Sequence, residues 1–143
     1  MQMTLRRLMP SVPAARLMVA VQFIQFGVVG VSGFLVDTAT VYGLWHALGL
    51  YGAGLAGYVT AASSNWLLNR IWTFRGHGSG SARRQWARFM VTNLGGFVLN
   101  RGTYAALVAF LPIAARQPVI AIAAGAVAGM FVNFILSRRL VYR

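Results

Sequence analysis

Long apolar stretches separated by short polar segments run along most of the chain, and they predict membrane-length helices. We expect four helices, near residues 22–45, 53–72, 86–110 and 119–136. A bilayer core takes about 20 apolar residues per helix, which is the length of these stretches. The Gly-rich segment "HALGLYG" at 46–52 predicts a turn between the first two helices, and "LPIAARQP" predicts one between the last two. The predicted fold is therefore an all-α integral membrane protein.

The polar segments between these helices predict how the chain is organised. We expect an N-terminal segment over 1–21, a first helical hairpin over 22–74, a Gly/Ser/Arg linker over 75–85, and a second hairpin over 86–143 with a basic tail. The linker contains "RGHGSGSARR", a composition typical of flexible connections. Arginines followed by an apolar stretch at the start of the chain are also found in signal peptides. This stretch is long and no convincing A-x-A-like cleavage site ends it, so we expect it to be retained.

The same pattern occurs twice in the chain. "FGVVGVSGFLVD" at 26–37 aligns with "FMVTNLGGFVLN" at 89–100, and "NWLLNRIWTFR" at 65–75 aligns with "NFILSRRLVYR" at 133–143. Chance similarity between apolar segments does not explain the matched Asn, Gly and Arg columns. Each copy crosses the membrane an even number of times, so the two hairpins should share one orientation. They form a parallel repeat related by an axis along the membrane normal.

Charge gives the predicted helices an orientation. The chain has 13 Lys and Arg residues against one Asp or Glu, a net charge of +12. Such an excess on a soluble surface would suggest a nucleic-acid partner. Here the arginines avoid the apolar stretches, so we expect no nucleic acid. Cytoplasmic loops are enriched in positive charge, which predicts a multi-pass protein of the inner (cytoplasmic) membrane with both termini and the linker cytoplasmic. The arginines on this side are Arg6, Arg7, Arg16, Arg70, Arg75, Arg83, Arg84, Arg88, Arg138, Arg139 and Arg143.

Two ionisable residues interrupt the apolar stretches, Asp37 and Arg101. A charge at the bilayer centre costs about 2.5–3.5 kcal/mol, and residues that bear this cost are usually functional. At about 1.5 Å per residue, both lie roughly 20 Å from the cytoplasmic ends of their helices. Similar depth permits pairing across the repeat interface. The alternatives are a structural ion pair and a polar site for a charged ligand, and we favour the second. Asn100 occupies the Asp37 column in the second copy.

A duplicated polar set lies near the predicted cytoplasmic surface. Asn65 and Asn69 are four residues apart and share a helix face, and Arg70 follows them. The second copy has Asn133 and Arg138 in the corresponding columns. Taken singly, such Asn residues join helices and such Arg residues extend to lipid phosphates. As a duplicated set they predict a positively charged mouth that accepts an anionic headgroup.

Other kinds of chemistry are not indicated. The chain has no Cys and no P-loop Lys, so disulfides and direct ATP hydrolysis are excluded. His46 and His77 lack partners at metal-ligand spacing. Gly125 and Gly129 have the G-x-x-x-G spacing of close helix packing rather than of a nucleotide loop. We therefore expect no catalytic residue, no metal and no cofactor.

Three stretches, "QFGVVGVSGFLVD", "SSNWLLNRIWTFR" and "RQWARFMVTNLGGFVLN", resemble the GtrA-like family of small four-helix membrane proteins. The resemblance covers roughly residues 25–143. It departs from the family pattern in the fourth span, where Ser137 replaces Asn. The resemblance implies translocation of a polyprenyl-phosphate-linked monosaccharide to the outer leaflet, for cell-surface polysaccharide synthesis by a glycosyltransferase. Some members are viewed instead as membrane anchors that recruit such a transferase.

The resemblance also implies roles for the polar residues. Arg70 or Arg138 would capture the phosphate at the inner surface and Arg101 would hold it midway, because guanidinium groups suit phosphate geometry. Carboxylate and amide groups would bind sugar hydroxyls. Tyr42 and Trp45 would stack on the sugar or anchor at the interface. The expected substrate-binding residues are Asp37, Arg101, Asn100, Asn65, Asn69, Arg70, Asn133, Arg138, Tyr42 and Trp45.

Four helices are few to enclose a polar cavity, so we expect a homodimer or a groove open to lipid. The expected partners are membrane lipids, the lipid-linked sugar and a membrane glycosyltransferase. A small cation exporter is a third interpretation, because Asp37 could serve as its acidic residue. Arg101 at similar depth would repel a cation, so we rank this interpretation last.

Overall fold

The computed structural model describes residues 13–78 and 80–143, and the regular structure of these residues is helical. The chain divides into two compact units, Met1–Gly76 and His77–Arg143. Most of the predicted N-terminal segment, with Arg6 and Arg7, lies outside the described residues.

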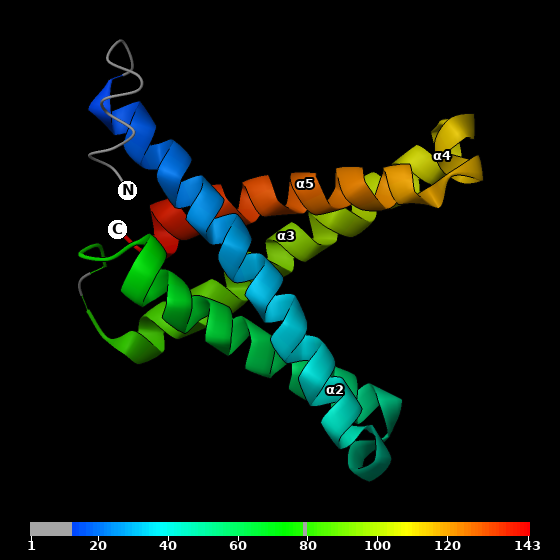
Figure 1. The fold of residues 1–143 in the computed structure, drawn as a ribbon, viewed down its shortest axis with the longest axis horizontal. Helices are drawn as coiled ribbons and strands as arrows, with labels where there is room; N and C mark the ends of the chain where they lie inside the picture. Colours follow the sequence, from blue (N-terminus) through cyan, green and yellow to red (C-terminus); the bar gives the residue numbers. More distant parts are fainter. Residues whose placement is uncertain (1–12, 79) are drawn as a thin grey trace. The chain divides into compact units, whose positions relative to one another are not determined.

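The first unit is a helical hairpin made from one interrupted helix. Helix α2 spans Ala14–Leu68 and is broken at Gly49, whose φ of 68° and ψ of 171° are not helical. Glycine has no Cβ and adopts this φ without strain, which lets the chain reverse. Figure 1 shows α2 folding back on itself here. The break lies inside the turn predicted at 46–52, but helix continues closer to it on both sides than predicted.

Helix α2 also begins earlier than expected, at Ala14 instead of residue 22. The added stretch, "AARLMVAV", consists mostly of good helix formers, and Pro13 stands immediately before it. Arg16 interrupts the apolar pattern but does not break a helix. The predicted segment 1–21 is thus partly helical.

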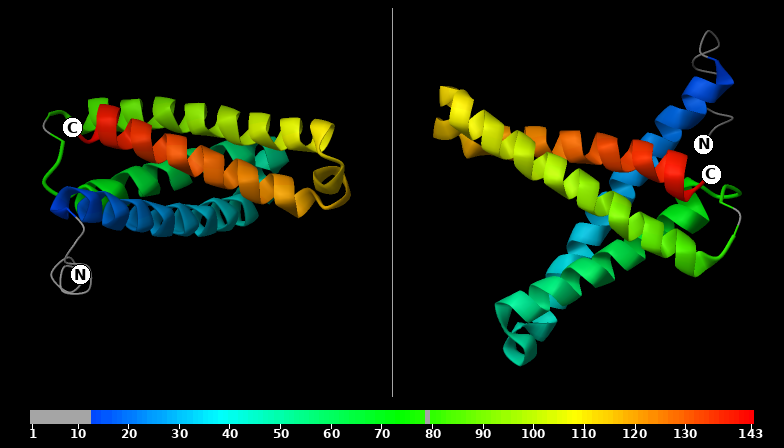
Figure 2. Two further views of the ribbon diagram at one scale, coloured as in Figure 1. Left: turned by 90° about the horizontal axis from the view of Figure 1, so that it is seen from above. Right: turned by 180° about the vertical axis from the view of Figure 1, so that it is seen from behind.

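The second unit is also a hairpin. It contains α3 (Ala82–Phe110), the short helix α4 (Pro112–Arg116) and α5 (Pro118–Leu136). Figure 2 shows α3 and α5 side by side, joined by α4. Helix α4 occupies the predicted "LPIAARQP" turn, and each of α4 and α5 begins with a proline, whose missing N–H is not needed at a helix start. Helix α3 starts inside the predicted linker, because no residue after Ser81 opposes helix formation.

Both hairpins end in a short π-helix. Helix η1 spans Asn69–Thr73 and follows α2, while η2 spans Ser137–Val141 and follows α5. The amide of Phe74 donates to the first carbonyl of η1 at 2.8 Å, and the amide of Tyr142 donates to the first carbonyl of η2 at 2.9 Å. The predicted helix ends at 72 and 136 did not include this change of helix type.

Matched aromatic pairs close the same end of each hairpin. Phe26 packs edge-to-face on Phe74 with ring centroids 6.3 Å apart, within the first unit. Phe89 packs on Tyr142 at 6.2 Å in the same manner, within the second unit. These four residues are columns of the sequence repeat. The two copies therefore form the same local contacts, each inside its own unit.

Two helical stretches among the described residues are long and apolar enough to cross a membrane, judged by length and composition. They are Ala14–Gly49 and Ile120–Val141. The other two predicted spans are less apolar. Helix α3 carries arginines from Arg83 to Arg101, and the second arm of α2 contains several Ser and Asn residues, which lowers their hydropathy. The predicted number of four spans stays a prediction.

Candidate functional site

In the first unit, two of the predicted site residues lie against glycines of the facing arm. Asn65 covers Gly33, where an added Cβ would lie 2.6 Å from the Asn65 Cγ. Asp37 covers Gly57, where an added Cβ would lie 2.5 Å from the Asp37 Oδ1 and 2.9 Å from a methyl group of Val41. Small residues let helix backbones approach closely in membranes. Here they also leave room for a polar side chain between the arms.

The second unit repeats this arrangement. The Asn133 side chain covers Gly96. Asn100 lies against Gly125, where an added Cβ would be 2.6 Å from the Asn100 carbonyl oxygen and 3.3 Å from its Oδ1. A Cβ on Gly129 would lie 2.9 Å from the Gly96 carbonyl oxygen. The close-packing role predicted for Gly125 and Gly129 is confirmed.

The structure adds a column to the repeat that the sequence comparison missed. Gly57 precedes Asn65 by the same interval as Gly125 precedes Asn133, and each of these glycines receives the polar side chain of the first helix. The glycine spacing was visible in the sequence. The structural role of these glycines was not visible, because it depends on the side chain that faces them, which is Asp37 in the first copy.

Several buried side-chain oxygens lack a hydrogen-bond partner within residues 13–78 and 80–143. More than about 90% of buried polar groups in native proteins are paired, so such atoms are candidates for binding water or a ligand. As acceptors, they suit donors such as sugar hydroxyls. They belong to Gln22, Tyr58, Asn65, Asn69, Thr73 and Asn133.

The three arginines expected to bind phosphate have different surroundings. Arg70, in η1, is half-buried with its guanidinium 5.9 Å from the centre of the Trp66 ring. Arg101, in α3, is exposed and lies 5.6 Å from the Phe97 ring centre. Arg138 is exposed in η2. The first two have the geometry of cation–π contacts, which hold the guanidinium in place without neutralising it.

Asp37 is half-buried in the first unit and Arg101 belongs to the second. Their pairing across the repeat would join the two units, and it stays a prediction. Tyr42 and Trp45 are exposed near the chain reversal, with ring centroids 6.2 Å apart, and the Trp45 ring packs on His46 at 4.6 Å. This exposure is compatible with stacking on a sugar and with interface anchoring.

Two buried glutamines were missed by the sequence reasoning. Gln22 and Gln85 occupy the same repeat column and are 5% and 6% exposed. The Nε2 of Gln85 donates to the Val141 carbonyl at 3.3 Å, which ties the start of α3 to the C-terminal tail. The sequence could have indicated these residues, because the same Gln occurs in "VQFIQF" of the first copy and "RQWARF" of the second.

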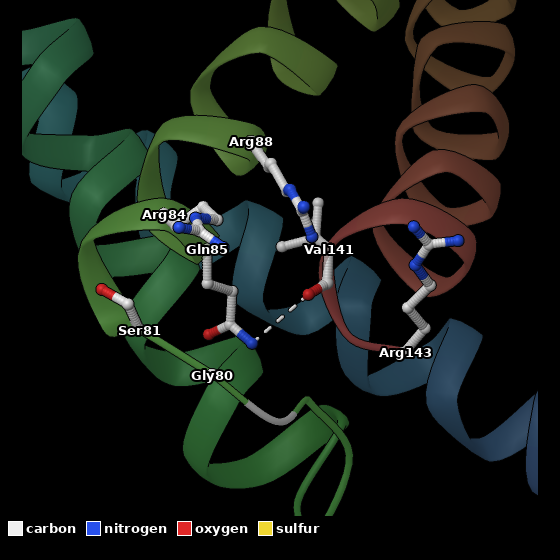
Figure 3. A pocket seen from close by; sticks show the side chains of 7 residues that line it. All are labelled: Gly80, Ser81, Arg84, Gln85, Arg88, Val141 and Arg143. Atoms are coloured by element: carbon white, nitrogen blue, oxygen red, sulfur yellow. Dashed lines mark hydrogen bonds between the residues drawn. The ribbon is translucent and has the colours of Figure 1, made fainter.

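A small hollow in the second unit gathers arginines that the sequence reasoning used only for orientation (Figure 3). Its volume is about 80 Å³. Arg84 and Arg88 are four residues apart and share a helix face, which the sequence could have indicated. Its lining residues are Gly80, Ser81, Arg84, Gln85, Arg88, Val141 and Arg143.

A family model for the GtrA/DPMS transmembrane domain matches residues 25–142. The chain belongs to this family. The resemblance inferred from the sequence motifs is thereby confirmed, and the protein is a membrane protein with a part in glycosyl-lipid handling or translocation. The matched residues include the glycine-backed polar contacts of both hairpins and both π-helices. No curated protein is similar enough to the chain to count as a match.

Proposed function

We propose that this GtrA/DPMS-family protein translocates a polyprenyl-phosphate-linked monosaccharide from the inner to the outer leaflet of the cytoplasmic membrane, for cell-surface polysaccharide synthesis. The observation that carries the proposal is the polar contact found in both hairpins. Asp37 on Gly57 and Asn100 on Gly125 keep a hydrogen-bonding side chain between two helices at matched positions. A family concerned with glycosyl lipids gives these contacts a substrate of matching chemistry.

The proposed topology has four spans with the termini and the central linker in the cytoplasm. The arginine distribution supports it, because the chain ends and the linker carry most of the positive charge. Arg116, in α4, would lie on the outer side. The Gly49 break in α2 and the α4 segment would then be the two outer turns.

The polar residues would lower the free-energy cost of moving a charged headgroup through hydrocarbon. Arg101 would bind the phosphate midway, since charge-assisted hydrogen bonds from guanidinium suit phosphate oxygens. The buried Oδ1 atoms of Asn65 and Asn133 lack partners in the described part of the chain and would accept hydrogen bonds from sugar hydroxyls. No covalent step is needed, so we propose a carrier and not an enzyme. The polyprenyl tail stays in lipid.

Other components complete the proposal. Use of the sugar by a membrane glycosyltransferase in the outer leaflet would drive net movement. A homodimer would give more protein around the headgroup than four helices can. Recruitment of the transferase without translocation is the alternative function.

The test uses proteoliposomes that contain a polyprenyl-phosphate monosaccharide and measures its exchange between leaflets. Asp37→Asn is the sharpest variant, because Asn100 already has this side chain packed on a glycine in the second unit. It removes the charge and keeps the shape. Arg101→Ala is paired with Arg116→Ala, an exposed arginine of α4 that serves as the control.

We expect rapid exchange by the wild type, at least tenfold slower exchange for Asp37→Asn and Arg101→Ala, and an unchanged rate for Arg116→Ala, where tenfold is about 1.4 kcal/mol in the barrier. Exchange no faster than in protein-free liposomes, by folded protein offered several sugars, would reject translocation and favour the anchor.

A further inference from the structure

The hollow in the second unit collects positive charge from two segments of the chain. Arg84 and Arg88 come from the first turns of α3, and Arg143 comes from the tail after η2. In Figure 3 the Arg88 side chain extends from α3 toward Val141, beside the hydrogen bond between Gln85 and Val141. Three guanidinium groups thus border one small space.

Packing around Gln85 holds this hollow in shape. Gln85 is 6% exposed and donates to the Val141 carbonyl. Gly78 of the linker has a φ of 94°, and an added Cβ there would overlap the Gln85 Nε2 and lie 3.6 Å from the Tyr142 Cα. Linker, helix and tail are therefore packed together. This packing fixes the backbone positions from which the three arginines extend, which lowers the entropic cost of bringing them onto one ligand.

The second unit has no acidic side chain of its own to balance the positive charge of the hollow. The chain's one acidic residue, Asp37, belongs to the first unit, so the sequence of the second unit contains none. The N-terminus of α3 adds to the positive potential. The first amide groups of a helix have no intrahelical partner, and Ser81 makes no side-chain capping bond to them.

Two of the three arginines are particular to the second copy, since Arg143 is matched by Arg75. The columns of Arg84 and Arg88 hold Val21 and Gln25 in the first copy, although Gln22 and Gln85 match. The duplication therefore kept the buried glutamine and differs in the charge around it. Arg138, the arginine expected from the sequence to bind phosphate in this copy, does not line the hollow.

We infer that this hollow binds one phosphate group of an anionic lipid headgroup at the cytoplasmic surface. The hollow is small, about 80 Å³, and we assign it to the phosphate group alone, with the sugar outside. Arginines bind phosphate oxygens through paired, charge-assisted hydrogen bonds. The inference rests on the proposed function, for which it would be the entry site.

The experiment measures ligand binding to the full-length protein in lipid nanodiscs that contain no anionic lipid. The probes are farnesyl phosphate, farnesol as the same chain without phosphate, and inorganic phosphate. The test variant is Arg84→Gln with Arg88→Gln. Its control is Arg83→Gln with Arg139→Gln, which removes the same charge from two exposed arginines that do not line the hollow.

We expect farnesyl phosphate to bind the test variant about tenfold more weakly than the wild type, and the control variant within about twofold of it. The tenfold estimate allows for the exposure of the arginines, which weakens each contact. Farnesol and inorganic phosphate should both bind more weakly than farnesyl phosphate. If the paired variant does not fold, Arg143→Gln replaces it and should also weaken binding of farnesyl phosphate.

Three results would overturn the inference: unchanged binding by the test variant, equal loss in the control variant, or inorganic phosphate binding as tightly as farnesyl phosphate. The last would assign the hollow to a soluble phosphate. Leaflet exchange measured on the same preparations separates the two proposals. Phosphate-dependent binding at the hollow without leaflet exchange would reject translocation alone. Leaflet exchange at an unchanged rate in the Arg84→Gln, Arg88→Gln variant would reject the entry site alone.

Discussion

The glycine contacts between helices can be tested by adding one methyl group. We predict that Gly125→Ala destabilises the second hairpin, because the new Cβ would lie 2.6 Å from the Asn100 carbonyl oxygen. Ordinary contact begins near 3.4 Å, so the helices must separate by most of an ångström. The obstructing atom belongs to the backbone and cannot rotate away as a side chain can.

The matched control is Gly102→Ala in α3, where an added Cβ has no atom within 4 Å. Alanine stabilises a helix interior by about 0.5–1 kcal/mol relative to glycine, and both variants gain this amount. Overpacking costs about 1–3 kcal/mol and applies to Gly125→Ala alone. The free energy of unfolding should therefore be lower for Gly125→Ala than for Gly102→Ala by about 1–3 kcal/mol.

The difference can be measured by reversible unfolding of the full-length protein in mixed micelles, with helicity followed by circular dichroism. Taking the difference between two Gly→Ala variants removes helix propensity from the comparison. Equal stability of the two variants would refute the close approach of α3 and α5 at this position, and with it the packing of Asn100 on Gly125.

The same unfolding assay checks three further predictions. Phe89→Leu removes the edge-to-face contact with Tyr142, so it should lower the free energy of unfolding by about 0.5–1.5 kcal/mol more than the control Phe97→Leu, at an exposed position. Equal losses in the two variants would contradict this. Thr73→Val should gain about 1 kcal/mol, since the buried hydroxyl has no partner among the described residues, and a loss of stability would show that the hydroxyl is bonded. Gln85→Leu should lower the free energy of unfolding by about 1 kcal/mol because it removes the donor to the Val141 carbonyl, and unchanged stability would contradict this.

Much of the helical architecture could be predicted from the apolar pattern, because a long apolar segment in lipid must satisfy its own backbone hydrogen bonds and a helix does so. The reversal near Gly49 was predicted within its turn, as a Gly-rich segment interrupting an apolar run. The π-helices were not predictable. Their residues, such as Asn69 and Ser137, fit an ordinary α-helix equally well, and the extra residue per turn is decided by tertiary packing.

The sequence indicated several of the polar residues that the structure places between helices, but not the contacts they make. The repeat indicated Asp37 and Asn65 but not the glycines beneath them, because a glycine gains meaning only from the side chain that covers it. The arginine hollow was missed for a different reason. Arg143 is far from Arg84 in sequence, and only folding brings the tail beside the start of α3.

The two copies agree where the helices pack and differ where charge is placed. Glycine-backed contacts, aromatic pairs and π-helices recur in both hairpins. In contrast, Asp37 stands opposite Asn100 in the alignment, Thr38 opposite Arg101, and Val21 opposite Arg84. A packing contact constrains both copies equally, because each must close its own hairpin. A charge in a membrane is costly, so nothing favours duplicating it where one copy is enough. This asymmetry agrees with the proposed transport of one charged headgroup, since the carboxylate of Asp37 lies in one hairpin and Arg84 and Arg101 lie in the other.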